Sequence, residues 1–153
     1  MHKLELKVPP PAVALLLAVA MWGLGGLAPH VELPSAVRVT AASLIALAGL
    51  GFDLAGVIAF GRAKTTVNPL RPDKTATVVT SGVYRITRNP MYVGMALILL
   101  AWAVLLSSAW ALLGPLVFVL YITRFQIRPE ERALAALFGS SYADYLASVR
   151  RWL

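Results

Sequence analysis

Residues Gly82 to Gly94 read G-V-Y-R-I-T-R-N-P-M-Y-V-G, and they run without a break into the apolar stretch 95–106. A basic and aromatic loop, marked by glycine and proline, therefore ends where an apolar helix begins. Such a junction can hold a small charged molecule at the boundary between water and lipid. Further along the chain, a second polar segment from Arg128 to Arg132 reads R-P-E-E-R. These two segments are the first candidates for a functional site.

The composition of the chain favours a membrane protein. Hydrophobic residues make up 59% of the 153 residues, and the mean hydropathy is +0.74. Charged residues make up only 14%, against roughly 25% in ordinary soluble domains. A soluble globule of this size would need more polar side chains on its surface. The length allows one domain, which we assign to residues 1–153.

Four apolar segments approach the length that a helix needs to cross a membrane, about 20 residues with a range near 17–25. They cover residues 11–28, 36–60, 91–106 and 109–125. The last two are slightly short and are separated only by Ser107 and Ser108, which predicts a tight helical hairpin. The sequence therefore predicts an all-α integral membrane bundle of four transmembrane helices. A central loop at 61–90 and a tail with short helices at 126–153 complete it.

The first apolar segment also resembles a secretory signal peptide. Lys3 and Lys7 precede it, and the A-V-A string at 18–20 is similar to a cleavage site. The apolar run continues past that string to Leu27, however, which is longer than a signal peptide needs. We therefore expect a retained helix.

The positive charges predict the orientation of the bundle. Of the fourteen lysines and arginines, only Arg38 lies beside the short loop 29–35. The other thirteen precede the first helix, lie in the central loop, or lie at or after the end of the fourth helix. By the positive-inside bias, both termini and the central loop are expected in the cytoplasm. This bias also accounts for the net charge of +7, so nucleic acid is not expected as a partner.

Metal chemistry and cysteine chemistry are not expected. The chain contains no cysteine, which excludes disulfides, thiolate metal sites and cysteine nucleophiles. His2 and His30 are isolated in the sequence, so they form no pattern of metal ligands and no arrangement with a serine and an aspartate.

Asn89 and Pro90 are typical of a helix start. An asparagine side chain accepts hydrogen bonds from the first free amides, and proline fits the first turn. Arg88, together with Arg85, adds positive charge at this end, which favours a bound carboxylate or phosphate. The alternative is that the arginines and the nearby tyrosines only anchor the helix at lipid headgroups. Glycines on both sides, at 82 and 94, favour a ligand because they allow close approach.

The acidic residues have two interpretations each. Glu130 and Glu131 either stabilise the start of a helix or hold a cationic or hydroxyl group of a ligand. Arg124 and Arg128 are near enough in sequence to pair with them. Asp53 is the one acid inside a predicted span, and such a carboxylate is a functional candidate because its burial is costly. A polar partner or a salt bridge to the loop explains Asp53 equally well.

The tail is predicted to form two short helices. Pro129 suits the first turn of one helix, and Gly139 suits its end. Ser140 or Ser141 can then cap a second helix at 142–150, whose tyrosines share one face.

Three consecutive features of the chain closely resemble the isoprenylcysteine carboxyl methyltransferase family. They are the string 82–94, an apolar hairpin, and then the segment R-P-E-E-R-A-L-A-A-L-F-G-S-S-Y-A-D-Y-L-A-S-V-R-R-W. This family is itself similar to the phospholipid N-methyltransferases. The resemblance covers residues 65–152, and the two motifs stand in the expected order. Eukaryotic members carry His-Pro where this chain has Asn89-Pro90, and they have more helices. The chain is therefore similar to short bacterial members, which implies a bacterial inner membrane.

The resemblance implies S-adenosylmethionine as cofactor and a lipophilic or membrane-embedded methyl acceptor, above all a carboxylate of isoprenylcysteine type. Carried over by position, the residues implied to line the cofactor pocket are Gly82, Val83, Tyr84, Arg88, Asn89, Pro90, Tyr92, Gly94, Glu130 and Glu131. Arg88, Arg128 and Glu131 are expected to serve catalysis, and Asp53 and Arg124 are expected to contact the acceptor. The surrounding partner is membrane lipid, and no oligomeric state is predicted.

Two other functions fit parts of the sequence. A membrane reductase of the sterol-reductase type would bind NADPH with a similar C-terminal architecture, but its additional helices are missing here. A small non-enzymatic transporter of four helices would need a deep acid in the first helix, where this chain has none, and would leave the long central loop unexplained.

Overall fold

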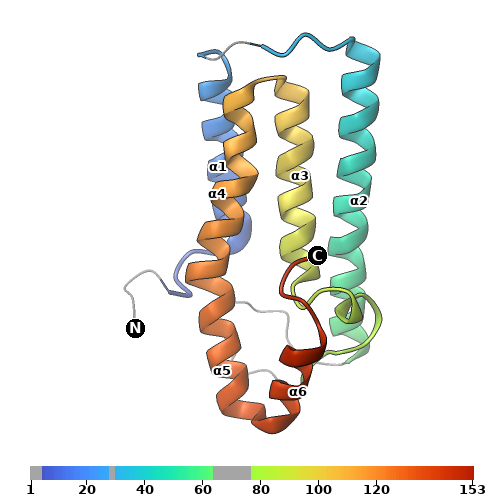
Figure 1. The fold of residues 1–153 in the computed structure, drawn as a ribbon, viewed down its shortest axis with the longest axis vertical. Coiled ribbons are helices and arrows are strands. Elements are labelled where there is room, and N and C mark those ends of the chain that lie inside the picture. Colours follow the sequence, from blue (N-terminus) through green and yellow to red (C-terminus); the bar gives the residue numbers. More distant parts are fainter. Residues whose placement is uncertain (1–4, 28–29, 64–76) are drawn as a thin grey trace.

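The computed structural model describes residues 5–27, 30–63 and 77–153, and within these ranges it is helical, with two isolated β-bridges and no strand. The described helices form four columns, which stand side by side (Figure 1). Their elements are α1 (Pro10–Gly25), α2 (Ser35–Arg62), α3 (Pro90–Leu106), and the short helix η3 (Ala109–Leu112) followed by α4 (Leu113–Ile122). The predicted all-α class is confirmed for the described residues.

The short helices lie at one end of the bundle. There, α5 (Arg128–Phe138), α6 (Ser140–Ser148) and the C-terminal residues lie near the start of α3, whereas the turn from α3 to α4 lies at the opposite end (Figure 1). The two predicted tail helices are therefore present, and Gly139 joins them with a φ of +56°. The predicted serine cap is not formed, because the Ser141 hydroxyl donates to the Phe138 carbonyl at 2.9 Å instead.

Among the described residues, two helices are long and apolar enough to cross a membrane. They are α2, with 28 residues, and the unbroken helical stretch Ala109–Phe138, with 30 residues. The helices α1 and α3 are also apolar but have only 16 and 17 residues. At 1.5 Å per residue they are about 24–26 Å long, against a hydrocarbon core of about 30 Å. Four membrane-spanning helices therefore stay a prediction.

The hairpin between α3 and α4 is as tight as predicted. Ser107 ends α3 in the left-handed conformation, with a φ of +49°, and both Ser107 and Ser108 are buried. The carbonyl of Ser107 accepts from the Val31 N–H at 2.8 Å, and its hydroxyl accepts from Arg38 Nη1 at 3.3 Å. The only basic residue expected at this end thus fastens the start of α2 to the turn.

The helices α2 and α3 pack backbone against backbone. A Cβ added at Gly49 would lie 2.8 Å from the Gly94 carbonyl oxygen, and one added at Gly56 would lie 2.7 Å from Met91 Cγ. Small residues at these positions let the two helices approach closely, as is common between membrane helices. On the other side of α3, the Trp102 indole N–H donates to the Ala18 carbonyl of α1 at 3.0 Å.

The fourth column differs from the predicted helix boundaries. The expected end at residue 125 and a new helix starting at Pro129 are both wrong, because the helix continues through a π-helical turn, η4 (Thr123–Ile127), directly into α5. Proline has no N–H, and its ring clashes with the carbonyl four residues earlier, which here is that of Phe125. A wider π turn accommodates this conflict without breaking the helix. The other predicted helix boundaries agree with the structure to within three residues.

Candidate functional site

Tyr92 of α3, Gln126 of η4 and Glu130 of α5 form a largely buried contact, which we call the inner cluster. The Tyr92 hydroxyl donates to Glu130 Oε1 at 2.7 Å, and Gln126 Nε2 donates to the same oxygen at 2.7 Å. Gln126 is only 2% exposed. Both bonds use Oε1, so Oε2 of Glu130 has no hydrogen bond within the described ranges. One carboxylate oxygen of this cluster is therefore left for a further donor or cation.

Glu131 has a different environment from its neighbour. The Arg151 guanidinium binds it in a bidentate manner, from Nε to Oε1 at 3.0 Å and from Nη2 to Oε2 at 2.8 Å. Arg88 approaches the same carboxylate, with Nη2 at 3.3 Å from Oε1. The hydrogen bond to Glu131 raises the pKa of Arg151, so this guanidinium stays charged across the ordinary pH range.

Arg88 retains binding capacity. Its Nη1 donates to the Leu146 carbonyl at 3.5 Å, which is a long contact. Its Nε is buried, and among the described residues it has no hydrogen-bond partner. A buried donor without a partner costs free energy unless water or a ligand accepts from it. Arg88 is therefore a candidate to hold an anionic group.

The C-terminal residues are fastened to the turn before α3. The Arg151 carbonyl accepts from Asn89 Nδ2 at 2.9 Å and from the Thr87 hydroxyl at 3.1 Å, and the Arg88 N–H donates to the Arg150 carbonyl at 2.9 Å. Asn89 stands at the predicted N-cap position. The predicted cap is wrong, however, since its side chain makes no bond to the first amides of α3 and donates to the tail instead.

Three tyrosines surround this polar region. They are Tyr84 of η2 (Gly82–Arg85) and Tyr142 and Tyr145 of α6, and all three are buried. The Tyr145 hydroxyl donates to the Tyr84 carbonyl at 2.8 Å. Burial raises the pKa of Tyr145 to about 12 and raises the pKa of Tyr84 and of Tyr142 well above the ordinary tyrosine value. These hydroxyls therefore stay neutral at physiological pH.

The structure brings several of the predicted site residues together. Residues from the loop, from α3 and from the R-P-E-E-R segment meet at one end of the bundle, as Tyr84, Arg88, Asn89, Tyr92, Glu130 and Glu131. Pro90 is buried at the start of α3, and Val83 packs beside Tyr84. Gly82 has a φ of +61° with open space around it, which a side chain adopts only with strain.

Other predicted site residues lie elsewhere. Asp53 of α2 contacts Gly94, and both face the α2–α3 interface, whereas Tyr92 faces the inner cluster. Asp53 Oδ1 is buried and has no hydrogen-bond partner among the described residues. Arg124 is bound by Glu5 at 2.9 Å. Arg128 is exposed, and within the described part of the chain it forms no ion pair. Their predicted roles in binding and catalysis stay predictions.

The sequence patterns did not indicate Gln126, Arg151 or Thr87 as residues of the site. Arg151 was counted only as one of the cytoplasmic charges, and Gln126 lies at the end of an apolar run. A polar residue one helical turn before Glu130 was the available signal for Gln126, because residues four apart share a helix face. Nothing local to Thr87 or Arg151 indicates that the two segments meet.

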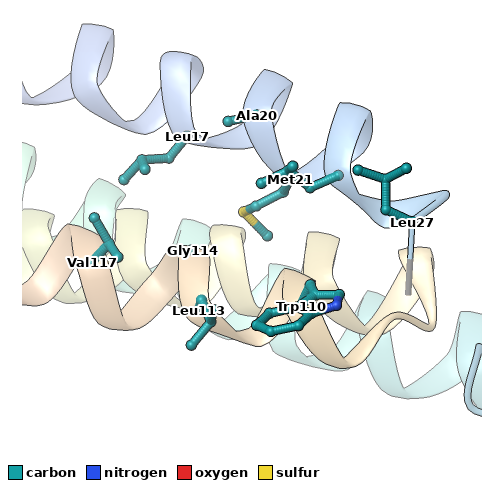
Figure 2. A pocket seen from close by; sticks show the side chains of 9 residues that line it. Leu17, Ala20, Met21, Leu27, Trp110, Leu113, Gly114 and Val117 are labelled. Carbon is teal, nitrogen blue, oxygen red and sulfur yellow. The ribbon is translucent and has the colours of Figure 1, made fainter. Parts of the chain in front are cut away.

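An apolar groove lies between α1 and the η3–α4 segment, toward the end opposite the polar region (Figure 2). Its volume is about 350 Å³, and its lining is Leu17, Ala20, Met21, Leu24, Leu27, Trp110, Leu113, Gly114 and Val117. Gly114 makes room for Met21, whose side chain would collide with a Cβ there. From Gly114 to Glu130 the helix extends about 24 Å at 1.5 Å per residue, the scale of a long hydrocarbon chain.

Comparison with known proteins points to one family. The phospholipid methyltransferase family matches residues 37–141, which run from α2 to the start of α6. An uncharacterized protein of Haemophilus influenzae is 48% identical over 63 residues, which are 41% of this chain and all of that protein. Protein-S-isoprenylcysteine O-methyltransferase B of Arabidopsis thaliana is 30% identical over 96 residues. That match covers 61% of this chain but only 47% of the plant protein. No solved structure matches the chain.

Proposed function

Because the chain belongs to the phospholipid methyltransferase family, we propose that it transfers a methyl group from S-adenosylmethionine to a lipophilic acceptor held in the membrane. One observation carries this proposal beyond the family match. The start of α3 and the acidic segment of α5 meet, through the Tyr92–Glu130 contact at 2.7 Å and the Arg88–Glu131 contact at 3.3 Å. The polar chemistry thus lies where apolar helices end.

The donor set of this region fits S-adenosylmethionine, which carries a carboxylate, an ammonium, a positive sulfur and ribose hydroxyls. The buried Nε of Arg88, without a partner in the described part of the chain, suits the carboxylate. The open Oε2 of Glu130 suits a positive group or a hydroxyl. Both oxygens of Glu131 are already bound by Arg151. We therefore assign the direct contact to Glu130 and a supporting contact to Glu131.

When bound, S-adenosylmethionine supplies a methyl carbon already activated by its positive sulfur, so a carboxylate or thiolate acceptor needs no general base. The protein's task is then to align the two reactants and to exclude water. Effective molarities on the order of 10⁵ M or more are available from such positioning. A site whose described side chains are arginines, glutamates and tyrosines therefore needs no covalent catalysis of its own.

We propose a carboxylate of isoprenylcysteine type as the acceptor. The Arabidopsis relative carries this activity in its name, and the apolar groove between α1 and α4 offers room for part of a hydrocarbon chain. Arg128 lies one turn before Glu131, exposed and without an ion pair among the described residues, so it is available to guide an anionic head group. Arg124 is less suited, because Glu5 already binds it.

A phospholipid amine is the second candidate acceptor. The matched family is named for phospholipids, and Asp53 is an intramembrane carboxylate whose Oδ1 has no partner in the described ranges. A labelled methyl donor separates the two acceptors in a lipid extract. A methyl ester releases its label as methanol in mild alkali, whereas a methylated amine retains it.

Calorimetric titration of the detergent-solubilised protein tests the cofactor assignment. We expect S-adenosylhomocysteine to bind and NADPH not to bind. Arg88→Ala should weaken the binding at least tenfold, because the buried guanidinium is the only assigned contact for the ligand carboxylate. Arg62→Ala removes the same charge from an exposed position at the end of α2 and should leave the affinity unchanged. Binding of NADPH alone, or equal affinities of the two variants, would contradict the proposal.

A further inference from the structure

The N-terminal segment makes an ion-pair contact that the proposed site does not use. The side chain of Glu5 is only 5% exposed, and it binds two arginines of the fourth column. Arg124 Nη1 lies 2.9 Å from Oε1, and Arg132 Nη2 lies 2.7 Å from Oε2. A carboxylate this deeply buried is stable only when it is paired. Glu5 therefore bridges two positions on the fourth column.

These two positions lie within and after the π turn. Arg124 lies inside η4, and Arg132 lies in the second turn of α5. Between them, the Phe125 carbonyl accepts from the Leu6 N–H at 3.1 Å. This is the carbonyl that Pro129 cannot use, because proline has no N–H. Leu6 makes the contact in the left-handed conformation, with a φ of +56°, which is unfavourable for a leucine. Residues 5 and 6 thus hold the irregular turn from outside.

The π turn decides which side chains face α3. It adds one residue to a helical turn, and each residue of an α-helix rotates by about 100°. Without this turn, all side chains after it would point about 100° away from their present direction relative to α4. Glu130 lies in the first turn of α5, just after the π turn, and its contact with Tyr92 therefore depends on that turn. The tail also binds here, since the Trp152 indole donates to the Thr123 hydroxyl at 3.1 Å.

We propose that Glu5 is a positioning residue that holds the π turn and so keeps Glu130 within hydrogen-bond distance of Tyr92. Its carboxylate joins Arg124 and Arg132, which would otherwise repel each other on one side of the helix. The effect on ligand affinity rests on the proposed function, because Glu130 is assigned there to the cofactor. The effect on the turn itself does not rest on it.

Hydrogen exchange, measured by mass spectrometry on the full chain, tests whether Glu5 holds the π turn; we call this set of contacts of Glu5 with Arg124 and Arg132 the brace. Glu5→Gln should accelerate amide exchange at least tenfold in residues 122–131 and leave the middle of α2 and α3 unchanged. Glu32→Gln is the matched control, because it removes the same charge from an exposed position at the opposite end. Unchanged exchange in 122–131 would overturn the proposal. Equal acceleration in every helix would also overturn it, since Glu5 would then support the whole fold.

Variants of Arg132, which also binds Glu5, provide a second test in case Glu5→Gln does not fold. They show whether the charge pair positions the π turn or only stabilises the protein in general. Arg132 is 58% exposed, so Arg132→Gln should fold. It should accelerate exchange in 122–131 and weaken S-adenosylhomocysteine binding, whereas Arg132→Lys should restore both. Failure of Arg132→Lys to restore either property would count against a charge-based brace. If the wild-type protein does not bind the ligand, the proposed function fails, but the exchange result still decides the brace.

Discussion

Glu130 and Glu131 are adjacent in the sequence, yet the structure gives them different chemistry. Neutral donors, a tyrosine hydroxyl and a glutamine amide, bind Glu130, while guanidinium groups bind Glu131. Successive residues of a helix point about 100° apart, so one carboxylate faces α3 and the other faces the tail. The first can receive a ligand, and the second holds the C-terminal segment in place.

Tyr92→Phe tests the inner cluster. The substitution removes one of the two donors to Glu130 Oε1 and leaves the ring in place. We expect a loss of about 1–3 kcal/mol in unfolding free energy and weaker binding of S-adenosylhomocysteine. Denaturant titration in detergent and calorimetry measure the two effects. Tyr121→Phe is the control, because Tyr121 contacts Phe125 through its ring and its hydroxyl has no hydrogen bond in the described part of the chain. Equal losses in the two variants would contradict the role of the Tyr92 hydroxyl.

Ionisation of the buried Tyr145 hydroxyl is expected to destabilise the folded protein in alkali. Burial raises the pKa of Tyr145 to about 12, above the ordinary value of about 10. Because the pKa is higher in the folded state than in the unfolded state, the buried neutral hydroxyl of Tyr145 contributes to the free energy of unfolding. This contribution is fully present below pH about 10 and is lost as pH rises through about 12. Tyr145→Phe should therefore flatten the decline of stability over this interval. Denaturant midpoints between pH 9 and pH 12 measure it, and an unchanged decline would refute the assignment.

At the scale of elements, the same residue type leads to different local structures, depending on what packs beside it. Pro90 begins α3, as expected, because it follows a turn that the tail holds in place. Pro129 does not begin a helix, because the helix before it bypasses the missing donor with a π turn. At Gly94, the space that a Cβ would need is filled by α2, so the glycine serves the close approach of two helices, and its predicted contact with a cofactor stays a prediction. The structure that a proline or glycine produces thus depends on the neighbouring element as well as on the local sequence.

Gly94→Ala tests the close approach of α2 and α3. The added Cβ would contact the Asp53 carboxylate and would lie 2.7 Å from the Gly49 carbonyl oxygen. The backbone cannot yield easily, so we expect a loss of about 1–3 kcal/mol. Gly51→Ala is the matched control, because nothing lies within 4 Å of its added Cβ; alanine's helix propensity should leave its midpoint equal or higher. A comparison of unfolding midpoints decides, and a stable Gly94→Ala variant would contradict the packing.

At the scale of the whole molecule, polar chemistry and apolar volume lie at opposite ends. The polar region lies around the start of α3, α5, α6 and the tail, which gather at one end of the bundle (Figure 1). The residues that line the groove between α1 and the η3–α4 segment place it toward the α3–α4 turn. An acceptor with a charged head and a long chain matches this arrangement. The positive charges predict that the polar end faces the cytoplasm.

Single-cysteine labelling tests this orientation, and it is clean because the natural chain has no cysteine. Glu32→Cys and Ser140→Cys place exposed thiols at opposite ends of the bundle. In intact cells, a membrane-impermeant maleimide should label position 32 only, and position 140 should react after permeabilisation. Labelling of position 140 alone in intact cells would invert the predicted topology.

Much of the fold could be predicted from the sequence because its signals are local. Apolar runs, the hairpin at Ser107 and Ser108, and the stop at Gly139 depend on residues within one or two helical turns. The two polar segments that carry the site could also be identified, since charged residues are rare in this chain. The residues between 64 and 76, part of the predicted central loop, lie outside the described ranges.

Only the tertiary structure decided which partner each polar side chain binds. Asn89 and Arg151, Arg124 and Glu5, and the two halves of the inner cluster come from segments far apart in the chain. Their contacts depend on how each helix is rotated when the apolar faces pack, and in the fourth column on one additional residue in a π turn. The apolar runs determine that helices form, but because these helices are apolar on all sides, the runs do not determine which face of each helix is buried. The rotation that pairs individual polar atoms emerges only when all the helices pack together.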